Sequence, residues 1–251
     1  MHKFFAKTEY LGKKVLILPQ CHSTNDEAQK LLKSKDFING ATVITDHQLN
    51  GKGQRGNSWV SEPGKNALFS LILETHFISM KKPFDLHMII SLALYDTLFP
   101  ILGKNLKIKW PNDLYYKSSK LAGILIENTI SKGQFENSVI GVGINVNQDK
   151  FHLENASSLL EITQNEHAIN EIIENFLINL ERRIATFDTE KSDALKNEYE
   201  RKLYLIGKTR VFKDSEGQFV GELIGVHDSG KLKIHNGNKL HLYDIKEISY
   251  V

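Results

Sequence analysis

The sequence has little of three features that would assign a protein to a particular class: cysteine, net charge and long apolar runs. Cys21 is the only cysteine, so an internal disulfide and a cysteine-based metal cluster are excluded, and a reducing compartment is indicated. The 32 basic and 30 acidic side chains leave a formal charge of +2, which gives no overall attraction to DNA or an anionic membrane. We find no signal peptide and no apolar run that suits a bilayer span. These absences predict a cytoplasmic protein without a nucleic-acid or membrane partner.

Several catalytic signatures are also missing. The ten histidines include no i, i+4 pair and no H-E-x-x-H, which argues against a zinc hydrolase. There is no G-x-S-x-G, and Cys21 and His22 are neighbours whose side chains would diverge on a strand. Nucleophilic catalysis by a side chain of this protein is therefore not indicated.

The composition is that of an ordinary folded protein, with 41% hydrophobic and 25% charged residues in a chain of 251. From about Gly207 onward, short alternating segments are divided by turn signals such as Asp228-Ser229-Gly230 and Asn236-Gly237. This change predicts two domains, at residues 1–206 and 207–251, the second a small β-barrel or sandwich packed against the first.

Hydrophobic periodicity predicts both strands and helices in residues 1–206. The predicted strands are Val15–Leu18, Ala41–Thr45, Leu68–Leu73, Leu106–Trp110, Leu121–Glu127 and Val139–Val146; the predicted helices run from Ser23 to about Lys33 and over Phe84–Leu98, Ala168–Phe187 and Lys191–Leu203. Thr24 and Glu27 have capping-box spacing at the start of the first helix. The stretch from Asn50 to Lys65 has almost no apolar anchors, which predicts a mobile loop held only by Trp59.

The most informative segment is Lys109-Trp110-Pro111-Asn112-Asp113, followed after seven positions by Lys120-Leu-Ala-Gly-Ile-Leu-Ile-Glu127. A cation, an indole, a carboxamide and a carboxylate around one proline suit nucleotide binding. The alternative is a tight turn whose polar side chains satisfy backbone donors while the tryptophan joins the core. Lys120, at the entry to an apolar strand, is either a solvated flank or a point charge on a reacting carboxylate and phosphate.

The segment Gly51-Lys52-Gly53-Gln54-Arg55-Gly56 follows a strand and matches G-x-G-x-x-G. A dinucleotide-binding role is rejected because residues 57–64 are poor helix material, and such a loop must open a helix. Its backbone N–H groups, with Lys52 and Arg55, could still hold a phosphate or carboxylate, and Trp59 could stack on a base. A flexible surface loop without a ligand is the competing interpretation.

Polar residues elsewhere have two interpretations each. Ser23, Thr24 and Asn25 suit a helix cap, although a cap at a pocket edge can also bind a ligand. Gln48 follows a strand and could lie on the surface or bind a ureido or amide group. Asn145 lies in an apolar strand, so its carboxamide must bond to the fold or to a ligand.

Taken in order, these segments and Gly141-Val-Gly-Ile-Asn145 resemble the catalytic domain of biotin protein ligases, and the region after Gly207 resembles that family's SH3-like domain. The resemblance implies an α+β fold: a mixed-sheet catalytic domain of the class II synthetase-like biotin/lipoate ligase type, then a small SH3-like β-barrel. It implies that ATP and biotin give biotinyl-5′-AMP and pyrophosphate. A lysine of a biotin carboxyl carrier protein then attacks this adenylate, and Mg²⁺ is expected with the nucleotide.

The resemblance also implies residue roles. Lys120 and Lys52 would be catalytic, and Asp113 would bind the metal. The biotin contacts would be Ser23, Thr24, Asn25, Gln48, Gly51, Lys52, Gly53, Gln54, Lys120 and Gly123; the nucleotide contacts would be Arg55, Trp59, Lys109, Asn112 and Asn145. Lys52 and Gln54 stand where the family often has arginine, which leads to the hypothesis that Gln54 retains the adenylate through backbone contacts alone.

Two other functions stay open. A lipoate or octanoate ligase would share the fold but lack the tryptophan motif, and a non-catalytic biotin or nucleotide sensor would lack the cation at Lys120. The DNA-binding domain of some family members is not expected, because about twenty residues precede Ser23 and show no helix-turn-helix pattern. A strand edge could serve for homodimerisation or for carrier docking.

Overall fold

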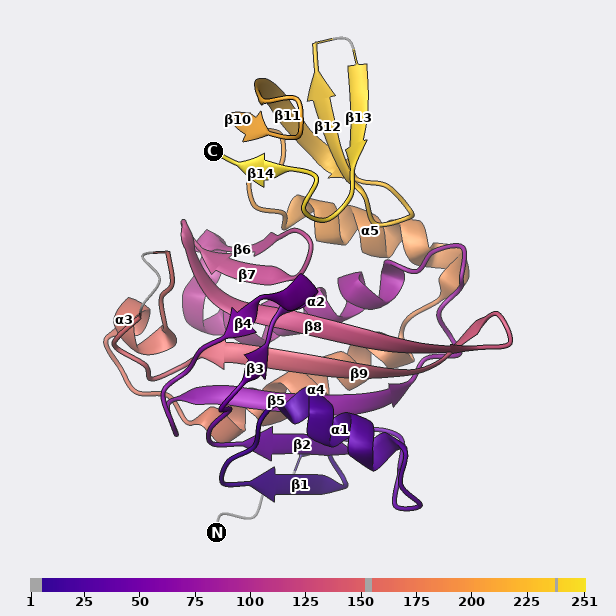
Figure 1. Cartoon of the computed structure of the whole chain (residues 1–251), viewed down its shortest axis with the longest axis vertical. Helices are drawn as coiled ribbons and strands as arrows, with labels where there is room; N and C mark the ends of the chain where they lie inside the picture. Colours follow the sequence, from indigo (N-terminus) through magenta and orange to yellow (C-terminus); the bar gives the residue numbers. More distant parts are fainter. Residues whose placement is uncertain (1–5, 152–154, 238) are drawn as a thin grey trace.

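The fold is built on a seven-stranded mixed sheet (Figure 1). The computed structural model describes residues 6–151, 155–237 and 239–251, and for Arg55 the backbone only. The strand order is β1-β2-β5-β9-β8-β7-β6, with β1 parallel to β2 and the other neighbours antiparallel. The strands are β1 Val15–Leu18, β2 Thr42–Thr45, β5 Asn66–Glu74, β6 Leu106–Lys109, β7 Asp113–Tyr116, β8 Ser119–Ser131 and β9 Gln134–Asn145.

Helices cover the two faces of this sheet unequally. The helices are α1 Thr24–Leu32, α2 Asp85–Leu102, α3 Leu159–Thr163, α4 Ile169–Ala185 and α5 Ser192–Arg201, with 3₁₀ turns η1 Gln54–Gly56, η2 Gly103–Asn105 and η3 Thr189–Lys191. In Figure 1, α2 and α4 lie behind the sheet, whereas α1 and the small hairpin of β3 (Gly51–Lys52) and β4 (Ser58–Trp59) lie in front of it. The predicted α+β class is confirmed.

Alternation along the central strands separates a packed face from a polar one. On β5, Phe69 and Leu71 point to the helical face, where the Phe69 ring lies 5.4 Å from that of Phe176 on α4 in an edge-on contact. Ser70, between them, points to the other face and is fully buried under α1. The front face of β5 therefore carries Ser70, a polar residue that lies between apolar neighbours in the sequence.

A second sheet, of five antiparallel strands, packs above the first through α5 (Figure 1). Its order is β13-β12-β11-β10-β14, with β10 Thr209–Lys213, β11 Gln218–Val226, β12 Leu232–Asn236, β13 Lys239–Tyr243 and β14 Ser249–Tyr250. Gly207 lies between α5 and β10, where the sequence predicts the domain boundary. The Trp110 indole N–H donates to the Gly230 carbonyl at 2.8 Å, so the two sheets are bonded to each other. The division into two domains stays a prediction.

One local prediction is wrong, and two short elements were not predicted. The capping box at Thr24 does not form: Ser23 is the N-cap, without a side-chain cap hydrogen bond, and Glu27 instead pairs with Lys30 at 2.7 Å. A capping box does form at α3, from Ser158 and Glu161, a short helix that the periodicity missed. Strand β7 was also missed; it has four residues and begins at Asp113, within the predicted Pro-Asn-Asp turn.

The segment of residues 50–65 has more structure than the predicted loop, since it contains the β3–β4 hairpin and η1. Its mobility stays a prediction. The stretch Asp85–Asn105, which comprises α2 and η2, is long and apolar enough to cross a membrane by length and composition alone. Most of it is buried in the fold, where α2 packs against α4 and the sheet as a core helix.

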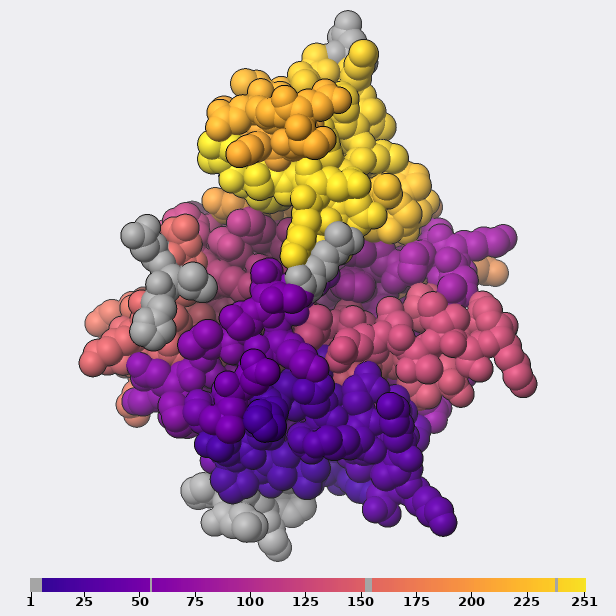
Figure 2. Space-filling model, in the orientation of Figure 1, coloured from indigo at the N-terminus to yellow at the C-terminus, as the bar shows by residue number. Residues whose placement is uncertain are grey.

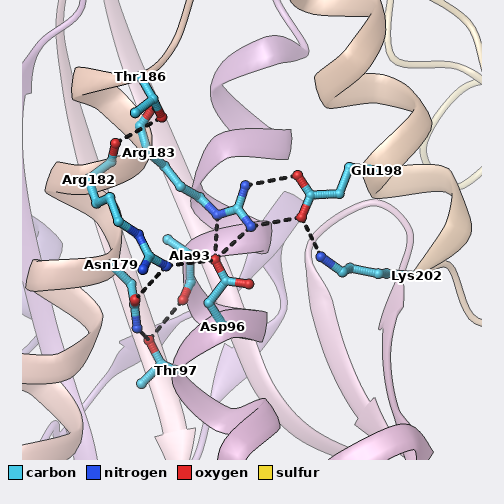
Figure 3. A network of polar contacts seen from close by, with 9 residues as sticks. All are labelled: Ala93, Asp96, Thr97, Asn179, Arg182, Arg183, Thr186, Glu198 and Lys202. Atoms are coloured by element: carbon cyan, nitrogen blue, oxygen red, sulfur yellow. Dashed lines mark hydrogen bonds and ion pairs between the residues drawn. The ribbon is translucent and has the colours of Figure 1, made fainter.

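A network of charges joins α2, α4 and α5 behind the sheet (Figure 3). The Arg183 guanidinium donates to Asp96 at 2.7 Å and to both oxygens of Glu198, at 2.9 and 3.2 Å. Lys202 also donates to Glu198. The hydrogen bonds from Arg183 are the main cause that lowers the pKa of the Glu198 carboxyl to about 2.

We predict that this network stabilises the fold at neutral pH. A lowered pKa favours the native state above the ordinary carboxyl pKa and loses that effect as pH falls toward 2. Glu198→Gln should therefore reduce the free energy of unfolding by about 1–2 kcal/mol at pH 7. In urea titrations between pH 7 and pH 3, the difference from wild type should shrink below about pH 5. The exposed Glu166→Gln is the control, and a difference independent of pH would contradict the prediction.

Candidate active site

A cavity of about 230 Å³ opens on the front face of the sheet. We call it the head cavity. It lies between the start of α1, the β3–β4 hairpin and strands β8 and β9, and two residues of the C-terminal region close one side. Its lining consists of Ser23, Thr24, Asn25, Gln48, Lys52, Gly53, Gln54, Asn57, Ser58, Trp59, Pro111, Asn112, Asp113, Lys120, Gly123, Ile124, Leu125, Gly141, Val142, Gly143, Ile245 and Lys246. In Figure 2 the yellow C-terminal region reaches down to the first half of the chain at this place.

Three glycines form the floor of the head cavity. Gly123 of β8 pairs with Gly143 of β9, and Gly141 lies two residues away on the same face. A Cβ at Gly143 would lie 2.6 Å from the Trp59 indole and one at Gly123 would lie 3.0 Å from it, so the indole rests directly on the sheet backbone. A Cβ at Gly141 would overlap the Asn25 carboxamide oxygen. The missing side chains therefore create the space for both residues.

One end of the head cavity is a buried polar network on α1. Gln48 Oε1 accepts hydrogen bonds from the Thr24 backbone N–H at 2.8 Å and from its hydroxyl at 3.1 Å. The Ser70 hydroxyl lies 2.7 Å from Thr24 Oγ1 and 2.6 Å from Asn25 Oδ1. Asn25 Nδ2 donates to Glu127 Oε2 at 2.7 Å. Thr24 and Asn25 thus bond to residues of β5, β8 and the segment after β2 rather than to the end of their own helix.

The sequence did not single out Ser70 or Glu127 as site residues. Ser70 is a lone hydroxyl in a strand whose other eight residues include six apolar ones, and this contrast is the signal that could have identified it. Glu127 closes the Lys120–Glu127 segment and lies half-buried below Asn25. Ile245 and Lys246 were missed as well, because no local pattern indicates that a turn of the C-terminal sheet reaches this cavity.

Both predicted catalytic lysines are paired with carboxylates. Lys120 Nζ lies 2.8 Å from Asp113 Oδ1, and Lys52 contacts Asp26. Burial raises the pKa of the Asp113 carboxyl, and the nearby Lys120 opposes that rise. The Lys120 backbone is fixed by hydrogen bonds with Asn155 and Ser157, which hold its side chain at the edge of the cavity.

A second cavity of about 200 Å³ lies on the other side of Trp59 and Lys120. It is lined by Ser58, Trp59, Val60, Lys120, Asn145, Gln148, Phe151 and Ala156. Lys120 Nζ lies 5.6 Å from the centre of the Trp59 ring, so one aromatic ring and one cation border both cavities. Asn145 Nδ2 donates to the Ser157 carbonyl at 3.1 Å, which satisfies part of its carboxamide within the fold.

The predicted biotin contacts gather around the head cavity. All of them line it except Gly51, whose Cα lies against the Trp59 carbonyl and the Gln48 amide too closely for a side chain. Their roles stay predictions.

The predicted nucleotide contacts do not gather in one place. Trp59 borders both cavities, Asn145 lines the second, and Asn112 lines the head cavity and donates to the Ile124 carbonyl. Lys109 lines neither cavity. Its ammonium lies 4.4 Å from the centre of the Tyr115 ring and 4.9 Å from that of Tyr250. The Arg55 side chain lies outside what the structure describes.

The residues at the head cavity fit a magnesium ion that arrives with a nucleotide. Mg²⁺ in such sites takes one or two carboxylates and completes its shell with phosphate oxygens and water. Asp113 offers one carboxylate, and its Oδ1 is buried and faces Lys120. A phosphate that drew Lys120 toward itself would leave this oxygen available to a metal.

Comparison with known proteins gives one family. The model of the biotin/lipoate A/B protein ligase family matches residues 17–145. The bifunctional ligase/repressor BirA of Bacillus spizizenii is 29% identical over 92% of this chain and 72% of its own length. The biotin–[acetyl-CoA-carboxylase] ligase of Mycobacterium tuberculosis is 26% identical over 89% of this chain and 84% of its own.

Comparison with solved structures gives the same family. The biotin protein ligase of Aquifex aeolicus in complex with biotin and ATP superposes with a TM-score of 0.78 and 26% identity, over 94% of this chain and 98% of that one. The family model covers more than half of the sequence and includes α1, the β3–β4 hairpin, β8 and β9, which build the head cavity. The chain therefore belongs to the biotin/lipoate A/B protein ligase family and is an enzyme with the fold of the biotin protein ligases.

Proposed function

We propose that this protein is a biotin protein ligase, which activates biotin with ATP as biotinyl-5′-AMP and transfers the biotinyl group to a lysine of a biotin carboxyl carrier protein. The observation that carries the proposal is the placement of Lys120 and Trp59 on the wall shared by the two cavities. A carboxylic acid in the head cavity and a nucleotide in the second cavity would meet at Lys120. We place the reaction in the cytoplasm.

The first step joins two anions. A biotin carboxylate oxygen attacks the α-phosphorus of ATP, the new C(O)O–P bond forms, and the bond to the β-phosphate oxygen breaks with release of pyrophosphate. Negative charge concentrates on the α-phosphate, so a fixed cation there lowers the barrier. Lys120 supplies that cation when it leaves Asp113, which lies 2.8 Å away. A magnesium ion held by Asp113 and the phosphates would add further positive charge.

The second step needs no nucleophile from this protein. The acceptor lysine amine attacks the acyl carbon of the mixed anhydride, AMP leaves with the bonding electrons, and the amine loses a proton as the amide forms. The protein's contribution is to retain the adenylate until the carrier arrives. Lys52, on the exposed edge of the β3–β4 hairpin, is the charged residue placed to do so.

We predict that Lys120→Ala lowers the rate of pyrophosphate–ATP exchange by about 100-fold or more, because it removes a preorganised charge from the transition state. The assay uses purified protein with magnesium and compares biotin, lipoate and octanoate. The control is Lys104→Ala, an exposed lysine that borders neither cavity. Exchange that depends on lipoate would make the protein a lipoate ligase, and no exchange with any acid would favour a sensor.

We also predict that Trp59→Ala raises the KM for ATP by about tenfold, because stacking of a base on an aromatic ring contributes about 1–3 kcal/mol. The chain has two tryptophans, and Trp110 is buried against the C-terminal sheet. A change of tryptophan emission on adding biotin and ATP should therefore disappear in Trp59→Phe. An emission change that persists in this variant would place the nucleotide elsewhere.

A further inference from the structure

Lys109 is a charged residue that the proposed chemistry does not use. It lines neither cavity, and Asp113, its cross-strand partner, pairs with Lys120 instead. The Lys109 ammonium donates to the Tyr115 hydroxyl at 3.2 Å and lies 4.9 Å from the centre of the Tyr250 ring. A half-buried ammonium is costly, and its contacts with the two rings offset part of that cost.

The two rings belong to different sheets. Tyr115 lies on β7, whereas Tyr250 lies on β14 of the C-terminal sheet, which is above β6 and β7 in Figure 1. The next residue, Trp110, donates to the Gly230 carbonyl of the C-terminal region. Two consecutive residues at the end of β6 thus contact the C-terminal sheet.

Tyr250 takes part in these contacts with its ring. The ring centre lies 5.5 Å from that of Phe212, which is fully buried, and β14 pairs with β10 at these two residues. The Tyr250 hydroxyl is buried and has no hydrogen-bond partner among the residues that the structure describes. The ring is therefore the part of this side chain that joins Lys109 to the C-terminal sheet.

The turn before β14 lines the head cavity with Ile245 and Lys246. Within this turn, of residues 244–247, the Glu247 N–H donates to the Asp244 carbonyl at 3.0 Å, and Glu247 Oε2 accepts from the Asp244 N–H at 2.6 Å. Lys246 has a φ of 72°, a conformation that residues other than glycine seldom adopt. The turn joins β13 to β14, so its place at the cavity is set by the strands at its two ends.

We propose that Lys109 is a positioning residue: through the Tyr250 ring it holds the turn of residues 244–247 at the head cavity. Binding in this cavity then depends on Lys109, although its ammonium touches no ligand. The inference rests on the proposed function, because it takes biotin as the occupant of the head cavity. It gives Lys109 a role other than the nucleotide contact that the family resemblance implies.

The first test is hydrogen–deuterium exchange of residues 244–248 in the full chain, measured by mass spectrometry. Lys109→Met keeps the length of the side chain and removes its charge. It should raise the exchange rate of these amides about fivefold, because one cation–π contact no longer holds the turn. Tyr250→Phe keeps the ring and should exchange as wild type does. Lys107→Met, the same substitution two residues earlier on β6, is the control.

The second test measures the dissociation constant for biotin by calorimetry and the KM for ATP by pyrophosphate exchange. Lys109→Met and Tyr250→Leu should each weaken biotin binding about fivefold. The double variant should bind no more weakly than either single variant, since both changes remove the same contact. The KM for ATP should change by less than about twofold, because the turn does not line the second cavity.

The outcomes separate this inference from the proposed function. A KM for ATP that rises in Lys109→Met while biotin binding stays unchanged would make Lys109 a nucleotide contact, which overturns the inference. Additive effects of Lys109→Met and Tyr250→Leu, unchanged exchange of the turn, or a loss of thermal stability without weaker biotin binding would overturn it as well. If wild type does not bind biotin, the proposed function fails, and the exchange rates still show whether Lys109 positions the turn.

Discussion

The site depends on one constraint: the front face of strands β8 and β9 carries three glycines where the cavity lies. Gly123, Gly141 and Gly143 occupy alternate positions on neighbouring strands, so their bare backbone forms a continuous surface. The opposite face of the same strands carries apolar side chains that belong to the main hydrophobic core. Because that packed face holds the strands in place, the glycine positions can stay open without a loss of order. Both the Trp59 indole and the Asn25 carboxamide rest on this surface.

Charge pairing is the second organising feature. Lys120 and Lys52 are the cations that the proposed chemistry needs, and each lies against a carboxylate, Asp113 and Asp26 respectively. A partly buried ammonium without a counter-ion would be costly, and each pair offsets part of that cost. The pairs differ in environment, because Lys52 and Asp26 are more exposed than Lys120 and Asp113. Solvent screens the outer pair more, and Lys52 is thus the easier of the two to redirect toward an incoming anion.

Much of the fold follows from local patterns. Val15–Leu18 was predicted with the bounds that β1 has, and the apolar runs gave β2, β5, β8 and β9 and the long helices to within a few residues. Strand β7 was missed because it spans four residues beside a turn, and the Thr24 capping box failed because Thr24 bonds to Gln48 and Ser70. The Thr24 side chain therefore forms tertiary hydrogen bonds instead of the helix cap that its spacing to Glu27 predicts.

The site residues form two groups in the same way: some were predicted from local motifs, and others are brought to the site only by the fold. Most residues named from contiguous motifs line the head cavity, since a motif keeps its members close whatever the fold. Ser70, Glu127 and Lys246 come from three different elements, and only the folded chain brings them to one place. No spacing rule within the sequence links them. These residues could not be predicted from sequence patterns, because the patterns carry no information on contacts between distant segments.

The motif Lys109–Asp113 shows why a motif can be placed correctly and still be misassigned in detail. Its second half, Asn112 and Asp113, faces the head cavity, as a nucleotide-binding segment should. Its first half turns to the C-terminal sheet: Trp110 donates to Gly230, and Lys109 lies between the Tyr115 and Tyr250 rings, where burial lowers the pKa of its ammonium. Both interpretations that the sequence allowed, a ligand segment and a structural turn, thus apply to different residues of one loop. The C-terminal region therefore contacts the site through this loop as well as through its own residues, Ile245 and Lys246.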